Sequence, residues 1–304
     1  MTTADTEAGM AADDSLRADG GARHGLGEHG AHCPDEGVKI QIRGVYKVFG
    51  RRQADALAML RQGMDKSSVQ AETGASVGLA GIDADIPTGR ITCIMGLSGS
   101  GKSTLVRHLN RLIDPSAGEI LVDGENILAL SLAELRELRR HKISMVFQSF
   151  GLLPHINVLD NVAFGLSVRG ESRQQARQTA RLWLERVGLA EYEKNYPDEL
   201  SGGMRQRVGL ARALAIDAQI LLMDEAFSAL DPLIRYDMQD QLLALQQRLQ
   251  KTIVFITHDI EEALRLGQHV IILRDGKVEQ IGTPDDIRNH PVNEYVERFV
   301  VRRV

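Results

Sequence analysis

Gly96-Leu-Ser-Gly-Ser-Gly-Lys-Ser-Thr104 lies between a short apolar run and a segment with helical periodicity. The run before it, residues 91–95, is β-rich and apolar, which is typical of a buried parallel strand. Residues 102–112 carry leucine and valine at helical spacing. The glycines between the two elements let backbone N–H groups converge on an anion, and the N-terminus of the helix adds partial positive charge. The pattern therefore predicts a phosphate-binding loop.

Two side chains of this loop are suited to a nucleotide and its metal ion. Lys102 is placed to reach the β- and γ-phosphates, and the Ser103 hydroxyl to complete the Mg²⁺ shell. The alternative interpretation, a flexible turn, is disfavoured by the strand before the loop and the helix after it. The expected nucleotide-binding residues of the loop are Gly96, Ser98, Gly99, Gly101, Lys102, Ser103 and Thr104.

The length and composition fit one large α/β unit or two small domains: 304 residues, 43% of them hydrophobic. No stretch approaches the ~18 consecutive apolar residues of a membrane-spanning helix. The start of the chain also lacks the apolar region of a secretory signal. Two cysteines, Cys33 and Cys93, are too few for a disulfide framework, which fits a reducing cytoplasm.

Residues 1–36 differ from the remainder in charge and composition. Eight acidic residues and two arginines give this segment a net charge of −6, so the remainder carries +1 of the total of −5. The segment is rich in glycine, alanine and aspartate, and we expect a disordered acidic tail. Its three histidines and Cys33 are alternatively metal ligands, but no periodic scaffold would hold them in place. The near-neutral remainder argues against a nucleic-acid partner.

Residues 37–304 alternate between strand-like and helical segments, which predicts an α/β fold with a mostly parallel sheet. The expected strands are residues 38–49, 91–95, 118–127, 142–147, 219–223, 252–257 and 269–273. The expected helices are two short ones within residues 51–74 and those at residues 102–112, 131–140, 172–187 and 232–250. Residues 149–204 are interpreted as a helical subdomain inserted in the phosphate-loop core, and residues 51–76 as a further helical insertion.

An apolar run, residues 220–223, ends in two acids, Asp224 and Glu225. Parallel strands put their C-terminal ends near the ligand crevice. Asp224 is therefore the expected support for Mg²⁺, and Glu225 the residue that orients or deprotonates an attacking water. Adjacent carboxylates at a strand end are usually just solvated, so the interpretation depends on the phosphate loop.

Leu200-Ser-Gly-Gly-Met-Arg-Gln206 contains a second anion site, a serine and two glycines at the start of a helix. In the simpler interpretation, Ser201 only caps this helix, and the two roles are compatible. Two anion sites with one lysine suggest that Ser201, Gly202 and Gly203 bind a nucleotide held by another chain.

Together these motifs resemble those of ATP-binding cassette (ABC) proteins. The resemblance implies ATP and Mg²⁺ as ligands and an N-terminal antiparallel β subdomain beside the parallel core. It also implies a head-to-tail homodimer that sandwiches each ATP between one chain's phosphate loop and the partner's Ser-Gly-Gly segment. It further implies hydrolysis of ATP.

Four more positions match the family. Gln148 resembles the glutamine that contacts Mg²⁺ or water, and His258 resembles the histidine that senses the γ-phosphate. The segment Ser228-Ala-Leu-Asp231 resembles the loop that crosses the dimer interface. Phe49 resembles the aromatic residue that stacks on adenine. Taken alone, Gln148 reads as a surface amide, His258 as a helix-capping histidine and Phe49 as a core aromatic. Their register with the other motifs favours the functional interpretation.

The insertion at residues 51–74 and the segment Ala226-Phe-Ser-Ala-Leu-Asp-Pro-Leu-Ile-Arg235 resemble the ATPase subunit of glycine betaine/proline betaine importers. This implies uptake of a quaternary amine osmoprotectant through an integral-membrane permease, with a substrate-binding protein as an indirect partner. It also implies a peripheral location at the cytoplasmic face of the cell membrane. Some such subunits carry C-terminal nucleotide-sensing modules, for which a chain ending at Val304 leaves no room.

Three alternatives stay open at this point. The first is an ABC importer ATPase for another solute, and the second is a soluble ABC ATPase that acts on DNA or the ribosome. The third is a regulatory module that binds ATP without hydrolysing it. Soluble ABC ATPases usually fuse two cassettes or insert long coiled coils, neither of which occurs in this sequence. Glu225 and His258 argue against a module without turnover.

Overall fold

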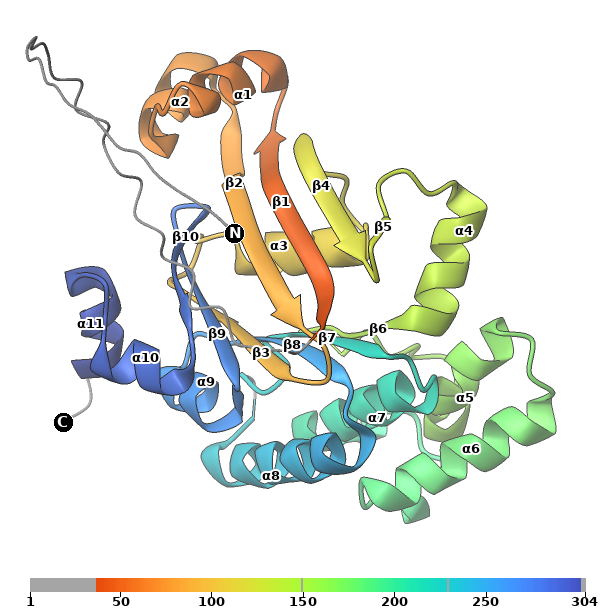
Figure 1. Ribbon diagram of the computed structural model, residues 1–304. Coiled ribbons are helices and arrows are strands. Elements are labelled where there is room, and N and C mark those ends of the chain that lie inside the picture. Colours follow the sequence, from red (N-terminus) through yellow and green to blue (C-terminus); the bar gives the residue numbers. More distant parts are fainter. Residues whose placement is uncertain (1–36, 149, 229, 302–304) are drawn as a thin grey trace, which may run out of the picture. The chain divides into compact units, whose positions relative to one another are not determined.

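Strands and helices alternate along the part of the chain that the structure describes, residues 37–148, 150–228 and 230–301 of a computed structural model (Figure 1). These residues belong to one compact unit. The expected acidic tail, with its histidines and Cys33, lies outside the described residues.

The first sheet has four antiparallel strands in the order β2-β1-β4-β5, as the resemblance implied. The strands are β1 (Val38–Phe49), β2 (Ser76–Pro87), β4 (Ala117–Val122) and β5 (Glu125–Asn126). Ile40 and Ile42 of β1 are buried, and the buried face then shifts by one residue to Val45. The shift occurs at Gly44, whose φ of 52° produces a bulge in the pairing with β2. β2 was not predicted from the sequence, although its buried residues alternate from Ala80 onward.

Two helices, α1 (Gln53–Arg61) and α2 (Lys66–Thr73), are inserted between β1 and β2, where two short helices were predicted. Asp65 caps α2 by accepting hydrogen bonds from Ser67 and Ser68, and these bonds hold the pKa of Asp65 well below its usual range. The helices pack on the strands through a separate apolar cluster. Its buried members are Val48, Ala56, Leu60, Val69, Ala75, Val77 and Ala80.

The second sheet has six strands in the order β10-β9-β3-β8-β7-β6. They are β3 (Ile91–Met95), β6 (Ile143–Val146), β7 (Ile220–Asp224), β8 (Thr252–Ile256), β9 (His269–Arg274) and β10 (Lys277–Gly282). All neighbouring pairs are parallel except β9 and β10. That hairpin turns at Asp275 and Gly276, both with the positive φ that Asp-Gly favours in two-residue turns. The predicted mostly parallel sheet is therefore confirmed.

Both faces of the parallel sheet are covered, which explains why its strands are continuously apolar. Cys93 and Met95 of β3 belong to one buried cluster, and Ile94 between them to another. The first cluster is completed by helices α5 (Val158–Val168), α6 (Arg173–Arg186), α7 (Gly202–Ala215), α8 (Pro232–Leu249) and α9 (Ile260–Leu266). The second is completed by α3 (Lys102–Leu109) and the antiparallel strands.

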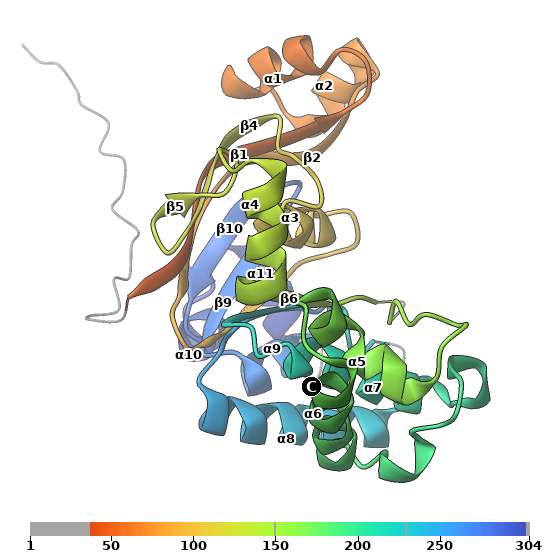
Figure 2. The ribbon, with the colours of Figure 1, turned by 90° about the vertical axis from the view of Figure 1, so that its right-hand side faces the viewer.

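Helices α5, α6 and α7 contact one another and lie together (Figure 2). They come from the segment between β6 and β7, where the sequence predicted helices. Two short helices, α10 (Pro284–Asn289) and α11 (Glu294–Val301), end the described part of the chain and were not predicted.

Two predicted helices are shorter than expected. Helix α4 (Leu132–Glu137) begins at a capping box formed by Ser131 and Glu134 but becomes a π-helical turn over Leu138–Lys142, instead of continuing to Arg140 as an α-helix. Helix α3 ends at Leu109 rather than residue 112, because Arg111 takes a positive φ of 51°. Arg139 holds that turn by donating hydrogen bonds to the carbonyls of Asn110 and Arg111.

His269, at the start of β9, makes the stability of the fold sensitive to mild acid. Burial, together with the positive charge of Arg90, lowers the pKa of His269 to about 4, although Asp85 acts in the opposite direction. An unfolded chain protonates this histidine near pH 6.5, its ordinary pKa. The contribution of His269 to stability is therefore complete above about pH 6.5 and is lost as the pH falls toward 4.

We expect His269→Gln to reduce this acid sensitivity. Between pH 7 and pH 5 the parent chain should lose about 1–2 kcal/mol more unfolding free energy than the variant. Urea denaturation at both pH values measures the difference. Equal losses in the two proteins would contradict the assignment.

Candidate nucleotide-binding site

A cavity of about 320 Å³ lies at the carboxyl end of the parallel sheet. It brings together the phosphate loop, the acidic end of β7 and the histidine that follows β8. Its lining residues are Ser98, Gly99, Gly101, Lys102, Ser103, Thr104, Glu225 and His258. All of them were predicted as site residues, from motifs up to 160 positions apart.

The phosphate loop requires glycine where it passes close to other backbone. At Gly96, with φ of 147°, an added Cβ would lie 2.3 Å from the carbonyl oxygen of Leu273. At Gly101, with φ of 104°, it would lie 2.7 Å from the carbonyl oxygen of Gly78. The loop is therefore held between β9 and β2, and its shape is set by the fold before any ligand binds.

Lys102 is 95% buried inside this loop, with 5% of its surface exposed. Its Nζ donates hydrogen bonds to the carbonyls of Gly96 at 2.9 Å and Leu97 at 3.1 Å. Burial lowers the pKa of Lys102, and the charges of Glu225 and Asp224 oppose that shift. An ammonium held by two neutral carbonyls beside a cavity is suited to an anionic ligand.

Ser103 and Asp224 join the phosphate loop to the end of β7. The Ser103 hydroxyl donates to Asp224 Oδ1 at 2.7 Å, and Asp224 is only 1% exposed. Arg107, one helical turn after Ser103, lies 3.5 Å from Asp224 Oδ2. Arg107 was not predicted, although its spacing of four from Ser103 places it on the same face of α3.

The oxygen donors at this point fit Mg²⁺ better than a transition metal. Ser103 offers a hydroxyl, Asp224 a carboxylate and Gln148 an amide oxygen, and hard oxygen ligands are those Mg²⁺ prefers. Within the described residues, no group of three or more His, Cys, Asp or Glu side chains is placed to hold a metal ion. A Mg²⁺ ion here would therefore complete its shell with phosphate oxygens and water.

Glu225 is held on the rim of the cavity by its neighbours. Gln148 donates from Nε2 to Glu225 Oε2 at 3.1 Å, which brings the two predicted residues together. The backbone of Glu225 has a φ of 48°, in the left-handed region that non-glycine residues rarely adopt. Ser228 stabilises this turn by donating from Oγ and from its backbone N–H to the Glu225 carbonyl, at 2.9 and 3.2 Å. Strain of this kind is concentrated at functional sites.

Phe49 lies beside the start of α3. A Cβ added at Gly78 would be 2.9 Å from the Phe49 ring and 3.3 Å from the Thr104 methyl, so glycine lets the three residues meet. The ring is 38% exposed, and Lys47 Nζ lies 5.0 Å from its centroid. An exposed aromatic surface next to the phosphate loop offers a stacking platform for a planar ring.

Ser201, Gly202, Gly203 and Asp231 are not part of the cavity lining. Ser201 caps α7 as predicted, accepting a hydrogen bond from Met204 N–H at 3.3 Å. Asp231 caps α8 by accepting from Ile234 N–H at 3.1 Å. Space at Gly203 is tight, since an added Cβ would be 3.2 Å from the Ile234 side chain. Gly203 of the Ser-Gly-Gly turn therefore packs against the start of α8, and the turn does not line the cavity of its own chain.

Comparison with known proteins agrees with this geometry. A family model described as ABC transporter matches residues 79–228. The chain is 52% identical over 260 residues to the trimethylamine N-oxide transport system ATP-binding protein TmoW of Ruegeria pomeroyi, covering 86% of this chain and 76% of that protein. This chain belongs to the ABC transporter ATP-binding family. The resemblance drawn from its motifs is thereby confirmed.

Another relative and a solved structure match over most of this chain. The glycine betaine/proline betaine transport system ATP-binding protein ProV of Escherichia coli is 55% identical over 262 residues, covering 86% of this chain and 66% of ProV. The chain thus spans just under two thirds of the length of that relative. A solved dimeric structure of the ATP-binding cassette MJ0796, in a post-hydrolysis state bound to ADP and Pi, matches with a TM-score of 0.69 and 31% identity. It covers 81% of this chain and 98% of that one.

Within the described residues, this ABC protein contains no helix that is long and apolar enough to span a membrane.

Proposed function

We propose that this chain binds and hydrolyses ATP as the ATP-binding subunit of an ABC importer. The observation that carries the proposal is the single cavity lined by Lys102, Ser103, Glu225 and His258, with Asp224 bonded to Ser103 beneath it. These groups supply a cation and carboxylates at one edge of the sheet, which phosphoryl transfer requires.

Each residue has a distinct task in the proposed reaction. Lys102 and the N–H groups of the loop bind the β- and γ-phosphates, while Phe49 stacks on adenine. Ser103, Asp224 and Gln148 would hold Mg²⁺, which neutralises charge on the phosphates when bound. Glu225 orients or deprotonates the attacking water, and His258 contacts the γ-phosphate.

The second anion site completes the cavity in a homodimer. We propose that Ser201, Gly202 and Gly203 of one chain close over the triphosphate held by its partner, with Asp231 at the same interface. Their absence from the cavity of their own chain supports this arrangement. The dimeric state of the MJ0796 cassette, bound to ADP and Pi, supports it as well. Closure excludes water and so strengthens every electrostatic contact to the γ-phosphate.

The transported solute is proposed to be a small methylated amine, a quaternary amine osmoprotectant such as glycine betaine or proline betaine. ProV, a glycine betaine/proline betaine transport protein, supports this class, and TmoW, a trimethylamine N-oxide transport protein, extends it. The solute would pass through an integral-membrane permease, delivered by a substrate-binding protein, with this chain peripheral at the cytoplasmic face. We further propose that residues 149–204 act as the helical subdomain that docks the permease.

Glu225→Gln should retain ATP binding and lose hydrolysis. The amide keeps the size of the side chain but removes the charge that orients water, so phosphate release should fall about 100-fold or more. Phosphate release and equilibrium ATP binding are measured on the same preparation. Glu137→Gln, a matched change on α4 outside the cavity lining, is the control. Undiminished turnover in Glu225→Gln would refute the assigned role.

The solute class is tested by uptake. Cells without betaine uptake, expressing this chain together with the permease and binding protein of a betaine importer, should accumulate labelled glycine betaine. Competition by an excess of unlabelled proline betaine, choline or trimethylamine N-oxide then ranks how well each of these amines is recognised. The Glu225→Gln chain should abolish accumulation. If ATPase activity is present but no methylated amine is taken up, the solute assignment is wrong and the ATPase assignment stands.

A further inference from the structure

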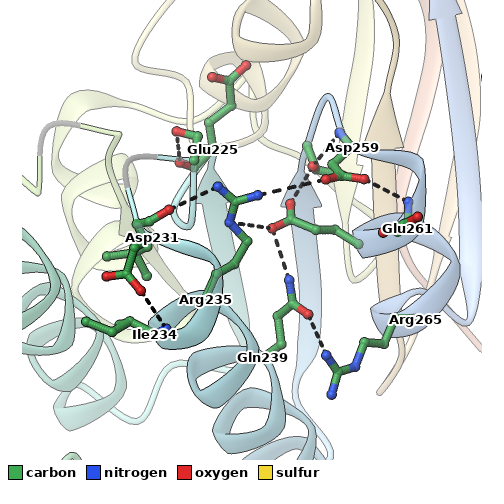
Figure 3. A network of polar contacts seen from close by, with 12 residues as sticks. Glu225, Asp231, Ile234, Arg235, Gln239, Asp259, Glu261 and Arg265 are labelled. Carbon is green, nitrogen blue, oxygen red and sulfur yellow. Dashed lines mark hydrogen bonds and ion pairs between the residues drawn. The ribbon is translucent and has the colours of Figure 1, made fainter. Parts of the chain in front are cut away.

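A polar network links the loop that carries His258 to the start of α8 (Figure 3). Thr257 Oγ1 donates to the buried carboxylate of Glu262 at 2.5 Å and accepts from the backbone N–H of Asp259 at 2.9 Å. The residues on either side of His258 are thus fixed by one hydroxyl. Because Glu262 is only 7% exposed, the loop is anchored to the interior through α9.

Arg235, on the first turn of α8, faces this loop and the segment before its own helix. Its Nη2 donates to the carbonyl of Leu230 at 3.0 Å, directly before the cap residue Asp231. Its Nη1 lies 3.8 Å from Asp259, and its Nε 3.8 Å from Glu262. One guanidinium therefore lies within 4 Å of two carboxylates that follow His258 and also bonds to the Leu230–Asp231 segment.

The contacts of Arg235 are incomplete in a way that leaves room for movement. Its buried Nε–H has no hydrogen-bond acceptor, although Glu262 Oε1 is 3.8 Å away. A buried donor without an acceptor is costly, and a hydrogen bond of about 2.9 Å needs a shift of only about 1 Å. Glu262 Oε1 is held meanwhile by Gln239 Nε2 at 3.0 Å. A small displacement of the His258 loop would complete the bonds.

We propose that Arg235 is a positioning residue that couples His258 to the Leu230–Asp231 segment at the dimer interface. The inference rests on the proposed ATPase function. When the γ-phosphate draws His258 toward the cavity, Asp259 and Glu262 close on the guanidinium, which in turn fixes the Leu230 carbonyl. Loss of Arg235 leaves the ATP cavity intact but uncouples its histidine from the partner-facing segment.

Arg235→Ala should lower the kcat of ATP hydrolysis about 10-fold or more while the Kd for ATP changes less than about twofold. Arg235→Lys, which keeps the charge but not the fork of donors, should recover part of kcat. Arg265→Ala is the matched control. Arg265 lies on the same network, bonded to Gln239 and Asp240, but contacts neither loop. It should stay within about twofold of the parent chain.

A double-mutant cycle separates coupling from simple loss of structure. If Arg235 acts through His258, then adding Arg235→Ala to His258→Ala should cost less than about threefold further in kcat. Effects that multiply in full, or an Arg235→Ala chain as active as Arg265→Ala, overturn the inference and leave the ATPase assignment intact. A parent chain that releases no phosphate overturns the proposed function and this inference with it.

Discussion

Parallel pairing of β3 with β8, and of β8 with β7, brings Ile94, Ile256 and Asp224 to one level of the central sheet. The loops that leave these strands then start side by side. The phosphate loop follows β3, His258 follows β8, and Glu225 follows β7. A one-residue slip in any of these registers would turn Asp224 away from Ser103 and move apolar residues out of their clusters. Register therefore determines both the core and the positions of the reacting groups.

The site places charges in a region that the fold has already desolvated. Lys102 is 5% exposed and Asp224 1% exposed, and buried charges are tolerated only when hydrogen bonds compensate them. Lys102 donates hydrogen bonds to two loop carbonyls. Asp224 accepts a hydrogen bond from Ser103 and forms an ion pair with Arg107. The geometry is therefore preorganised around the place where phosphate charge is expected. Positive φ at Glu225 shows that the strain of this arrangement is stored next to the cavity.

Local signals were sufficient to predict most of the fold and the cavity. The glycine-rich loop, the apolar strands and the helix cap at Ser201 all depend on residues a few positions apart, so they can be identified in a single sequence. β2 was missed because the helical insertion separates it from its partner β1, and its alternation includes small residues such as Ala84.

Contacts between residues far apart in the chain could not be predicted from the sequence. Nothing local indicates that Arg235 faces Asp259 and Glu262, or that Gly78 brings Phe49 to Thr104, because these contacts depend on how helices dock on the sheet. The early end of α3 has the same origin, since Arg139 comes from a distant turn to hold Arg111. Tertiary packing overrides local propensity at these points.

The most direct measurement asks whether each ATP site is shared between two chains. Lys102→Ala disables the phosphate loop, and Gly202→Asp adds a negative charge to the Ser-Gly-Gly turn, where an added Cβ has no heavy atom within 4 Å. Each variant alone should be inactive. When the two variants are mixed in equal amounts, some dimers contain one chain of each. In these dimers, the phosphate loop of the Gly202→Asp chain and the Ser-Gly-Gly turn of the Lys102→Ala chain form one intact site, so ATPase activity should return to a substantial fraction of the parent's. A mixture that stays as inactive as its components would contradict a site built by two chains.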